Sequence, residues 1–141
     1  ISLAISSDDA AFATPGVNIG LFCSTPMVAV SRKVSRKKTM QMLLTGDSIN
    51  ATYAKEIGLI NDHYPISKLE DEVLKFAKKI ASKSNSTIKI GKKAFYKQLE
   101  MPLSKAYKYT SKVMTKNAME LDAEEGISAF LEKRKPNWKN K

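Results

Sequence analysis

The hydrophobic pattern in the second half of the sequence constrains the fold more than any other feature. Apolar residues recur there at intervals of three, four and seven positions: Leu69, Val73, Phe76, Ala77 and Ile80. Residues at these intervals share one face of an α-helix. Lysines occupy the opposite face, at Lys75, Lys78 and Lys79. The spacing therefore predicts an amphipathic helix with one buried stripe.

More helices are expected after this one. A helix from Ser86 or Thr87 through about residue 99 is ended by Pro102, because proline disrupts a helix interior. A longer helix should start at Ser104 and run past residue 114. Asp122 is predicted to cap a last short helix through residue 131. The second half is thus predicted to be helical throughout.

The first half mixes strand and helix signals. Residues 1–6 and 11–13 are apolar enough for short strands, and Pro15 and Gly16 end the second of them. Thr25 before Pro26 predicts the start of a helix through residue 30.

Glycines and Asn50 mark the boundaries of two more helices in this half. One is expected over residues 40–44 and ends at Gly46, and the next over residues 51–57 is capped by Asn50 and ended by Gly58. Leu59 and Ile60 should lead into a strand before Pro65. The order of elements predicts an α/β fold with residues 1–65 as one part and residues 66–141 as a helical region.

Composition excludes several kinds of site. The chain has 141 residues, of which 43% are hydrophobic, a size and composition expected for one globular unit. One cysteine and one histidine leave no internal disulfide and too few soft ligands for zinc or iron, so we predict no metal site. No window is apolar enough to cross a membrane, and the opening at Ile1 resembles an internal strand rather than a signal peptide. We expect a soluble, non-secreted fragment of a longer protein.

The net charge of +10 suggests an anionic partner. Such a surface attracts nucleic acid, an acidic membrane face or a ligand carrying several phosphates, although most lysines on helices are simply solvated. Aromatic residues among the lysines, at Tyr96, Tyr107, Tyr109 and Trp138, suggest a nucleic-acid surface. Their helical spacing fits packing first, and the chain has only three arginines, the side chain that most often reads bases. Nucleic acid is therefore the weaker alternative.

Three segments, residues 12–27, 44–60 and 126–136, together resemble one family, the crotonase superfamily of enoyl-CoA hydratases and isomerases. The stretch from Phe12 to Met27 is similar to its active-site stretch, with Cys23 to Pro26 in place of a glycine-rich turn, as in a divergent branch of hydratase-domain proteins. Residues 44–60 resemble its turn, cap and helix, and residues 126–136 resemble its C-terminal signature. The resemblance implies the end of a crotonase-like ββα spiral core over residues 1–65, followed by a helical trimerisation region.

The resemblance also implies a ligand site. Residues that match Phe130 and Lys133 contact coenzyme A in the family, often in a site shared with a neighbouring subunit; the alternative is that Phe130 is core and Lys133 solvated. Pocket-lining residues are expected at Pro15, Gly16, Gly20, Leu21 and Phe22. The coenzyme A thioester would be a substrate, and no resident cofactor is expected.

The catalytic groups of the family's hydratases are largely missing. Gly16 stands where those enzymes carry a glutamate, and glycine cannot transfer a proton. The other glutamate and both backbone donors of the oxyanion hole match segments before Ile1. Cys23 with His63 and Asp62 does not form a convincing triad, because adjacent strand residues face opposite sides. We assign no catalytic residue, and the sequence leaves open whether the protein is an enzyme.

The resemblance predicts an acyl-CoA-binding fragment of an enoyl-CoA hydratase/isomerase family protein, inactive as an isolated chain. It would act in fatty acid or acyl-CoA metabolism and form a trimer or hexamer when complete. Bacterial cytoplasm or the mitochondrial matrix is the expected location, without a membrane partner. Two alternatives stay open: a basic helical module for nucleic acid, and a non-catalytic pseudoenzyme subunit.

Overall fold

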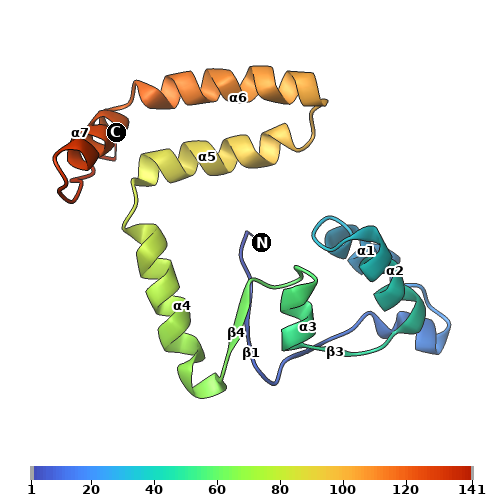
Figure 1. The fold of residues 1–141 in the computed structure, drawn as a ribbon. Helices are drawn as coiled ribbons and strands as arrows, with labels where there is room; N and C mark the ends of the chain where they lie inside the picture. The colour runs from blue at the N-terminus through green and yellow to red at the C-terminus, as the bar shows by residue number, and fades with distance from the viewer. Residues whose placement is uncertain (1, 141) are drawn as a thin grey trace. The chain divides into compact units, whose positions relative to one another are not determined.

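The computed structural model describes residues 2–140, and these form two compact units, residues 2–76 and 77–140 (Figure 1). The first unit contains all four strands of the described chain. The division between the units falls inside helix α4 (Ile66–Ala81). Each unit is described in turn.

The strands of the first unit form two small sheets. Strand β1 (Ile5–Ser7) pairs in parallel with β4 (Asp62–Tyr64), with Ser6 opposite His63. Strand β2 (Ala11–Phe12) pairs antiparallel with β3 (Ile49–Asn50). The parallel pair is extended by Asn61, whose amide donates to the carbonyl of Ala4 over 2.7 Å. The predicted opening strand is thus confirmed, although it starts four residues later than expected.

Helices fill the rest of the first unit. They are α1 (Ser24–Val30), α2 (Arg36–Thr45) and α3 (Ala51–Glu56), together with a 3-10 turn, η1 (Pro15–Ile19). Ala51 and Ala54 of α3 and Ile60 form a buried cluster, against which Phe12 and Ile49 of the antiparallel sheet pack. Small side chains at α3 allow the helix to approach the sheet closely. This cluster holds the sheets together.

The predicted helix boundaries are right where a backbone requirement sets them. Gly46 and Gly58 adopt φ values of 67° and 78°, the left-handed conformation that ends helices. The side chain of Asn50 accepts a hydrogen bond from the amide of Tyr53 over 2.9 Å, as expected of a cap. The prediction for α1 was wrong by two residues, because Cys23 and not Thr25 is the N-cap.

The second unit consists of packed helices. They are α5 (Asn85–Gln98), α6 (Leu103–Ala118) and α7 (Leu121–Leu131), and α5 and α6 run side by side (Figure 1). Each contributes one buried alanine, at Ala94, Ala106 and Ala129. A methyl side chain lets neighbouring helix backbones come close, so these alanines mark the contacts between the helices.

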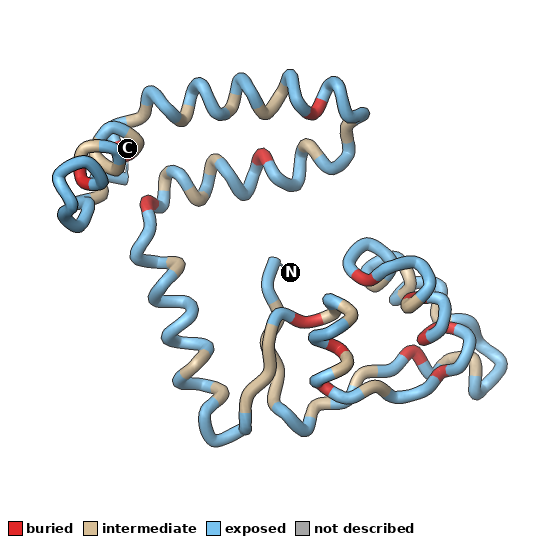
Figure 2. The backbone as a smooth tube through the Cα atoms, viewed as in Figure 1, coloured by how far each residue is buried: buried red, intermediate tan, exposed pale blue. Residues whose placement is uncertain are grey.

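Burial corrects one prediction. Helix α4 forms as expected, but Val73, Phe76 and Ala77 of its predicted buried stripe are exposed, and none of its residues is buried (Figure 2). Helical spacing records which face is apolar, whereas burial also requires a surface to pack against. The stripe therefore identifies a helix correctly without identifying its partner.

Candidate functional site

The residues predicted to line a pocket lie together in one loop, residues 14–23, which we call the Gly16 loop. Pro15 and Gly16 begin the η1 turn, and Gly20 ends it with φ 78°. The amide of Leu21 donates to the carbonyl of Gly16 over 2.9 Å, which closes the loop on itself. A proline followed by glycine favours this tight turn, because proline fixes φ and glycine tolerates crowding.

The space beside Gly16 is occupied by other atoms of the loop. A Cβ atom built at Gly16 would lie 2.7 Å from the carbonyl oxygen of Leu21 and 2.8 Å from the sulfur of Cys23. The amide of Gly16 also donates to that sulfur over 3.3 Å. Any side chain at this position therefore requires the loop to shift.

The outer side of the Gly16 loop is apolar and open. Leu21 and Phe22 are 63% and 44% exposed, so neither contributes to the core of the described unit. Thr14, just before the turn, is buried, and its hydroxyl oxygen has no hydrogen-bond partner among the described residues. Thr14 could not be singled out from the sequence, since a single threonine before Pro-Gly carries no distinctive signal.

The weak triad suggested by the sequence does not form around Cys23. The Nδ1 atom of His63 lies 2.6 Å from the carboxylate of Asp8, and Asp62 pairs with Lys55 over 2.7 Å. Lys55 holds the pKa of Asp62 below its ordinary value, helped by the amide of His63. The side chains of His63, Asp62 and Cys23 thus each interact with a different residue and not with one another.

The predicted coenzyme A residues lie at the end of α7. Phe130 is 82% exposed, so the alternative that it belongs to the core of this chain is wrong. Lys133 follows the helix with φ 54°, a left-handed conformation, and its amide donates to the carbonyl of Phe130 over 3.2 Å. An exposed aromatic residue and an exposed lysine therefore stand three positions apart at the C-terminal end of α7.

A network of carboxylates holds residues 132–140, which we call the C-terminal tail, onto α7. Asp122 is 1% exposed and accepts hydrogen bonds from the hydroxyl of Ser84 and the amides of Lys139 and Asn140. These donors, Ser84 first, lower the pKa of Asp122 below its ordinary value. The prediction that Asp122 is an N-cap was wrong: Glu120 is the N-cap, and the carboxylate of Asp122 binds the tail instead.

Trp138 adds an apolar contact to the same tail. Its indole nitrogen donates to the carbonyl of Ser82 over 2.8 Å, and a Cβ atom at Gly126 would lie 3.3 Å from its ring. Tyr109 also contacts a neighbour, because the ammonium of Lys97 lies 5.0 Å from its ring centre. Two of the aromatics that suggested a nucleic-acid surface therefore have roles in packing.

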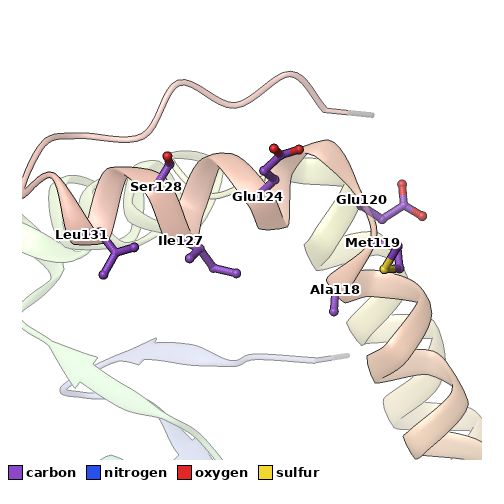
Figure 3. Close-up of a pocket in the computed structure, with 7 residues that line it drawn as sticks. All are labelled: Ala118, Met119, Glu120, Glu124, Ile127, Ser128 and Leu131. Atoms are coloured by element: carbon purple, nitrogen blue, oxygen red, sulfur yellow. The ribbon is translucent and has the colours of Figure 1, made fainter.

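A depression of about 400 Å³ lies where α6 meets α7 (Figure 3). Its lining is Ala118, Met119, Glu120, Glu124, Ile127, Ser128 and Leu131. Ile127 and Leu131 project from the same side of α7 in this view. Neither Phe130 nor Lys133 lines it, so it is separate from the predicted ligand residues.

Within residues 2–140 no group of three or more histidine, cysteine, aspartate or glutamate side chains could hold a metal ion. Among those same residues, no helix has both the length and the apolar character needed to span a bilayer.

Comparison with known proteins identifies similar chains. A family model described as enoyl-CoA hydratase/isomerase matches residues 2–141. The enoyl-CoA hydratase domain-containing protein 3, mitochondrial, of Rattus norvegicus is 51% identical over 136 residues, which are 96% of this chain and 45% of the relative. The human protein of that name is 49% identical with the same coverage. This chain thus spans about half the length of the curated relatives it matches.

Solved structures show the same fold. An enoyl-CoA hydratase of Mycobacterium smegmatis superposes with a TM-score of 0.92 at 44% identity, covering 97% of this chain and 53% of that one. The human enoyl Coenzyme A hydratase domain-containing protein 3 gives a TM-score of 0.90 at 49% identity, covering 97% and 54%. The predicted crotonase-like fold is therefore confirmed, and the partial match agrees with the predicted C-terminal portion.

Proposed function

This chain belongs to the enoyl-CoA hydratase/isomerase family, and we propose that it binds acyl-CoA thioesters without catalysing their hydration on its own. Membership of this family supports a general role in acyl-CoA metabolism. Binding and catalysis depend on different residues of the chain, so each part of the proposal has its own support.

The closed Gly16 loop is the observation that carries the catalytic part. Hydration requires a group that moves a proton to or from water within hydrogen-bond reach of the substrate. Glycine has no such group, and the carbonyl of Leu21 and the sulfur of Cys23 fill the space where a side chain would begin. The carboxylate of Asp8, which lies outside the loop, pairs with His63. The loop can shape a pocket, but it offers no proton.

The exposed pair at the end of α7 supports the binding part. Phe130 offers an apolar ring, and the Lys133 side chain forms no ion pair within residues 2–140. Coenzyme A carries several phosphates, which favour a cation. A net charge of +10 would further attract such a ligand.

Self-association is the second element of the proposal, as a trimer or hexamer of the complete protein. Large apolar side chains are exposed on α6, at the residue that ends it and on α7: Leu103, Tyr107, Met114, Met119, Ile127 and Leu131. Exposed apolar surface of this extent is typical of interaction sites. For location we propose the mitochondrion, because the relatives named above are described as mitochondrial.

A binding titration and an activity assay on the purified chain test the two parts separately. Calorimetry with crotonyl-CoA should show saturable binding, and loss of the conjugated double bond, followed by absorbance, should not exceed the rate in buffer. Phe130→Ala should weaken binding, whereas Phe95→Ala, which removes another exposed ring of the same unit, should not.

Two results would contradict the proposal. Hydration at rates typical of dedicated hydratases would overturn the catalytic part. Absence of crotonyl-CoA binding, together with salt-sensitive binding of a DNA oligomer at physiological ionic strength, would favour the nucleic-acid alternative.

A further inference from the structure

The turn that ends α7 has an unusual residue at its key position. The amide of Lys133 donates to Phe130 over 3.2 Å and the amide of Arg134 donates to Ala129 over 3.0 Å. This pair of bonds defines a common helix-ending motif whose left-handed residue is usually glycine, because glycine has no Cβ to clash there. Here that residue is Lys133, with φ 54°. Lys133 therefore carries a side chain in a backbone conformation that favours glycine.

The side chain of Arg134 links the turn after α7 to carboxylates of Glu125 and Glu132. Its guanidinium binds both carboxylate oxygens of Glu125, over 2.6 and 3.0 Å, and its Nε atom donates to Glu132 over 2.6 Å. Glu125 also accepts the amide of Asn137 over 2.6 Å. Arg134, and then Asn137, lower the pKa of Glu125 from 4.5 to about 2. A planar fork bound in this way fixes orientation as well as charge.

Two cations beside Arg134 remain available to a ligand. The charge of Arg134 is matched by Glu125 and Glu132, whereas Lys133 and Lys135 are exposed and form no ion pair within the described residues. Of these two, Lys133 is the one held in a disfavoured backbone conformation. Such conformations persist where the surrounding structure enforces them, and they are concentrated at ligand-binding positions.

We propose that Arg134 is a positioning residue, which fixes the left-handed turn so that Lys133, and not Arg134, meets a phosphate of the coenzyme A thioester. The inference rests on the proposed acyl-CoA binding and adds separate roles for the two residues: Lys133 contacts the ligand, and Arg134 fixes the turn. It implies that the lysine at this turn lowers stability while it improves binding. Stability and affinity should therefore change in opposite directions when Lys133 is replaced by glycine.

Substitutions of Lys133 separate the strain from the charge. Lys133→Gly should raise the melting temperature by about 2–4 °C, because the clash is removed. It should weaken crotonyl-CoA binding about three- to tenfold, because the ammonium is lost. Lys133→Ala should weaken binding equally without raising the melting temperature, and Lys133→Arg should preserve binding. Lys135→Ala is the matched control, which removes a neighbouring positive charge and should leave both properties nearly unchanged.

Substitutions of Arg134 test positioning against direct contact. Arg134→Lys keeps the positive charge but cannot form the fork to Glu125. It should weaken binding as much as Arg134→Gln does, in titrations performed well below the melting temperature. If Arg134 touched the phosphates through its charge, Arg134→Lys would retain binding, and that result would overturn the proposal.

A truncated ligand distinguishes the failure of this inference from that of the proposed function. Crotonyl-pantetheine lacks the nucleotide and its phosphates, so its binding should not respond to Lys133→Gly. If the wild-type chain binds crotonyl-CoA and Lys133→Gly leaves that binding unchanged, only the roles proposed for Lys133 and Arg134 are wrong. If the wild-type chain binds neither thioester, the proposed function is wrong as well.

Discussion

The Gly16 loop and the C-terminal tail are held by opposite kinds of contact. The loop closes through backbone atoms and the sulfur of Cys23, with no charged partner. The tail is tied to α7 by two carboxylates, Asp122 and Glu125, each accepting several hydrogen bonds. Charge-assisted bonds are stronger and more directional than contacts to sulfur. The tail that follows the predicted coenzyme A residues is thus held more firmly than the loop that is predicted to line the pocket.

The largest expected effect comes from removing the centre of the tail network. Asp122→Ala should lower the melting temperature by about 5–10 °C, since Ser84 and two backbone amides lose a buried acceptor. The melting temperature is measured by circular dichroism during heating. Glu100→Ala removes an exposed carboxylate of the same unit and serves as the control. Equal melting temperatures for the two variants would show that the tail contributes little to stability.

A smaller loss is expected at the loop. Gly16→Ala places a methyl group within 2.8 Å of the Cys23 sulfur and closer still to a carbonyl, and crowding of this kind costs about 1–3 kcal/mol. The free energy of unfolding, from urea titration, should fall accordingly. Gly91→Ala is the matched control, because no atom lies within 4 Å of its added Cβ. That change lies inside α5 and should instead stabilise the chain by about 0.5–1 kcal/mol. If Gly16→Ala left the free energy of unfolding unchanged, the loop would have to accommodate the methyl group by shifting at little cost.

Acid should affect the tail more than the loop. The pKa of Glu125 falls on folding from 4.5 to about 2, so the folded state binds fewer protons than the unfolded state in that window. Its stabilisation is complete above pH 4.5 and is lost as the pH falls through about 2. Urea titrations at pH 6, 4 and 3 should show this decline. Glu125→Gln should be less stable at pH 6 and less sensitive to acid, while an unchanged acid response would contradict the assignment.

The smallest effect is expected at an exposed ion pair. Lys55 and Asp62 lie 2.7 Å apart, and both side chains are partly in water. Pairs of this kind contribute little, because solvent screens them. Lys55→Ala should shift the melting temperature by less than about 2 °C, in contrast to Asp122→Ala. A shift as large as that of Asp122→Ala would show that the contributions of Asp62 and Asp122 to stability do not follow their burial.

Several elements were predictable because a single residue specifies them. Asn50 caps α3 and Gly46 ends α2, each through a requirement of its own backbone. The start of α1 was missed because proline is tolerated throughout the first turn of a helix, so Pro26 does not fix where that turn begins. Helix α2 starts at Arg36, earlier than expected, because its first residues are polar and carry no hydrophobic signal.

The candidate site was predictable only in part. Sequence similarity selected Phe130, Lys133 and the residues of the Gly16 loop, and their roles in binding remain predictions. The left-handed conformation of Lys133 could not be read from the sequence, because glycine is the residue that signals it. The pairing of Glu125 with Arg134 was also hidden, since nine positions separate them and no helical spacing joins them.

The sequence by itself determined the family, the helical second half, and the absence of a side chain at Gly16 that could transfer a proton, because these depend on residue identity and spacing along the chain. Tertiary structure alone decided that Asp122 binds Ser84 and the tail rather than capping its helix, and that atoms of Leu21 and Cys23 fill the space beside Gly16. Both outcomes depend on residues brought together by folding. Local sequence does not encode such distances, so only the folded chain could reveal them.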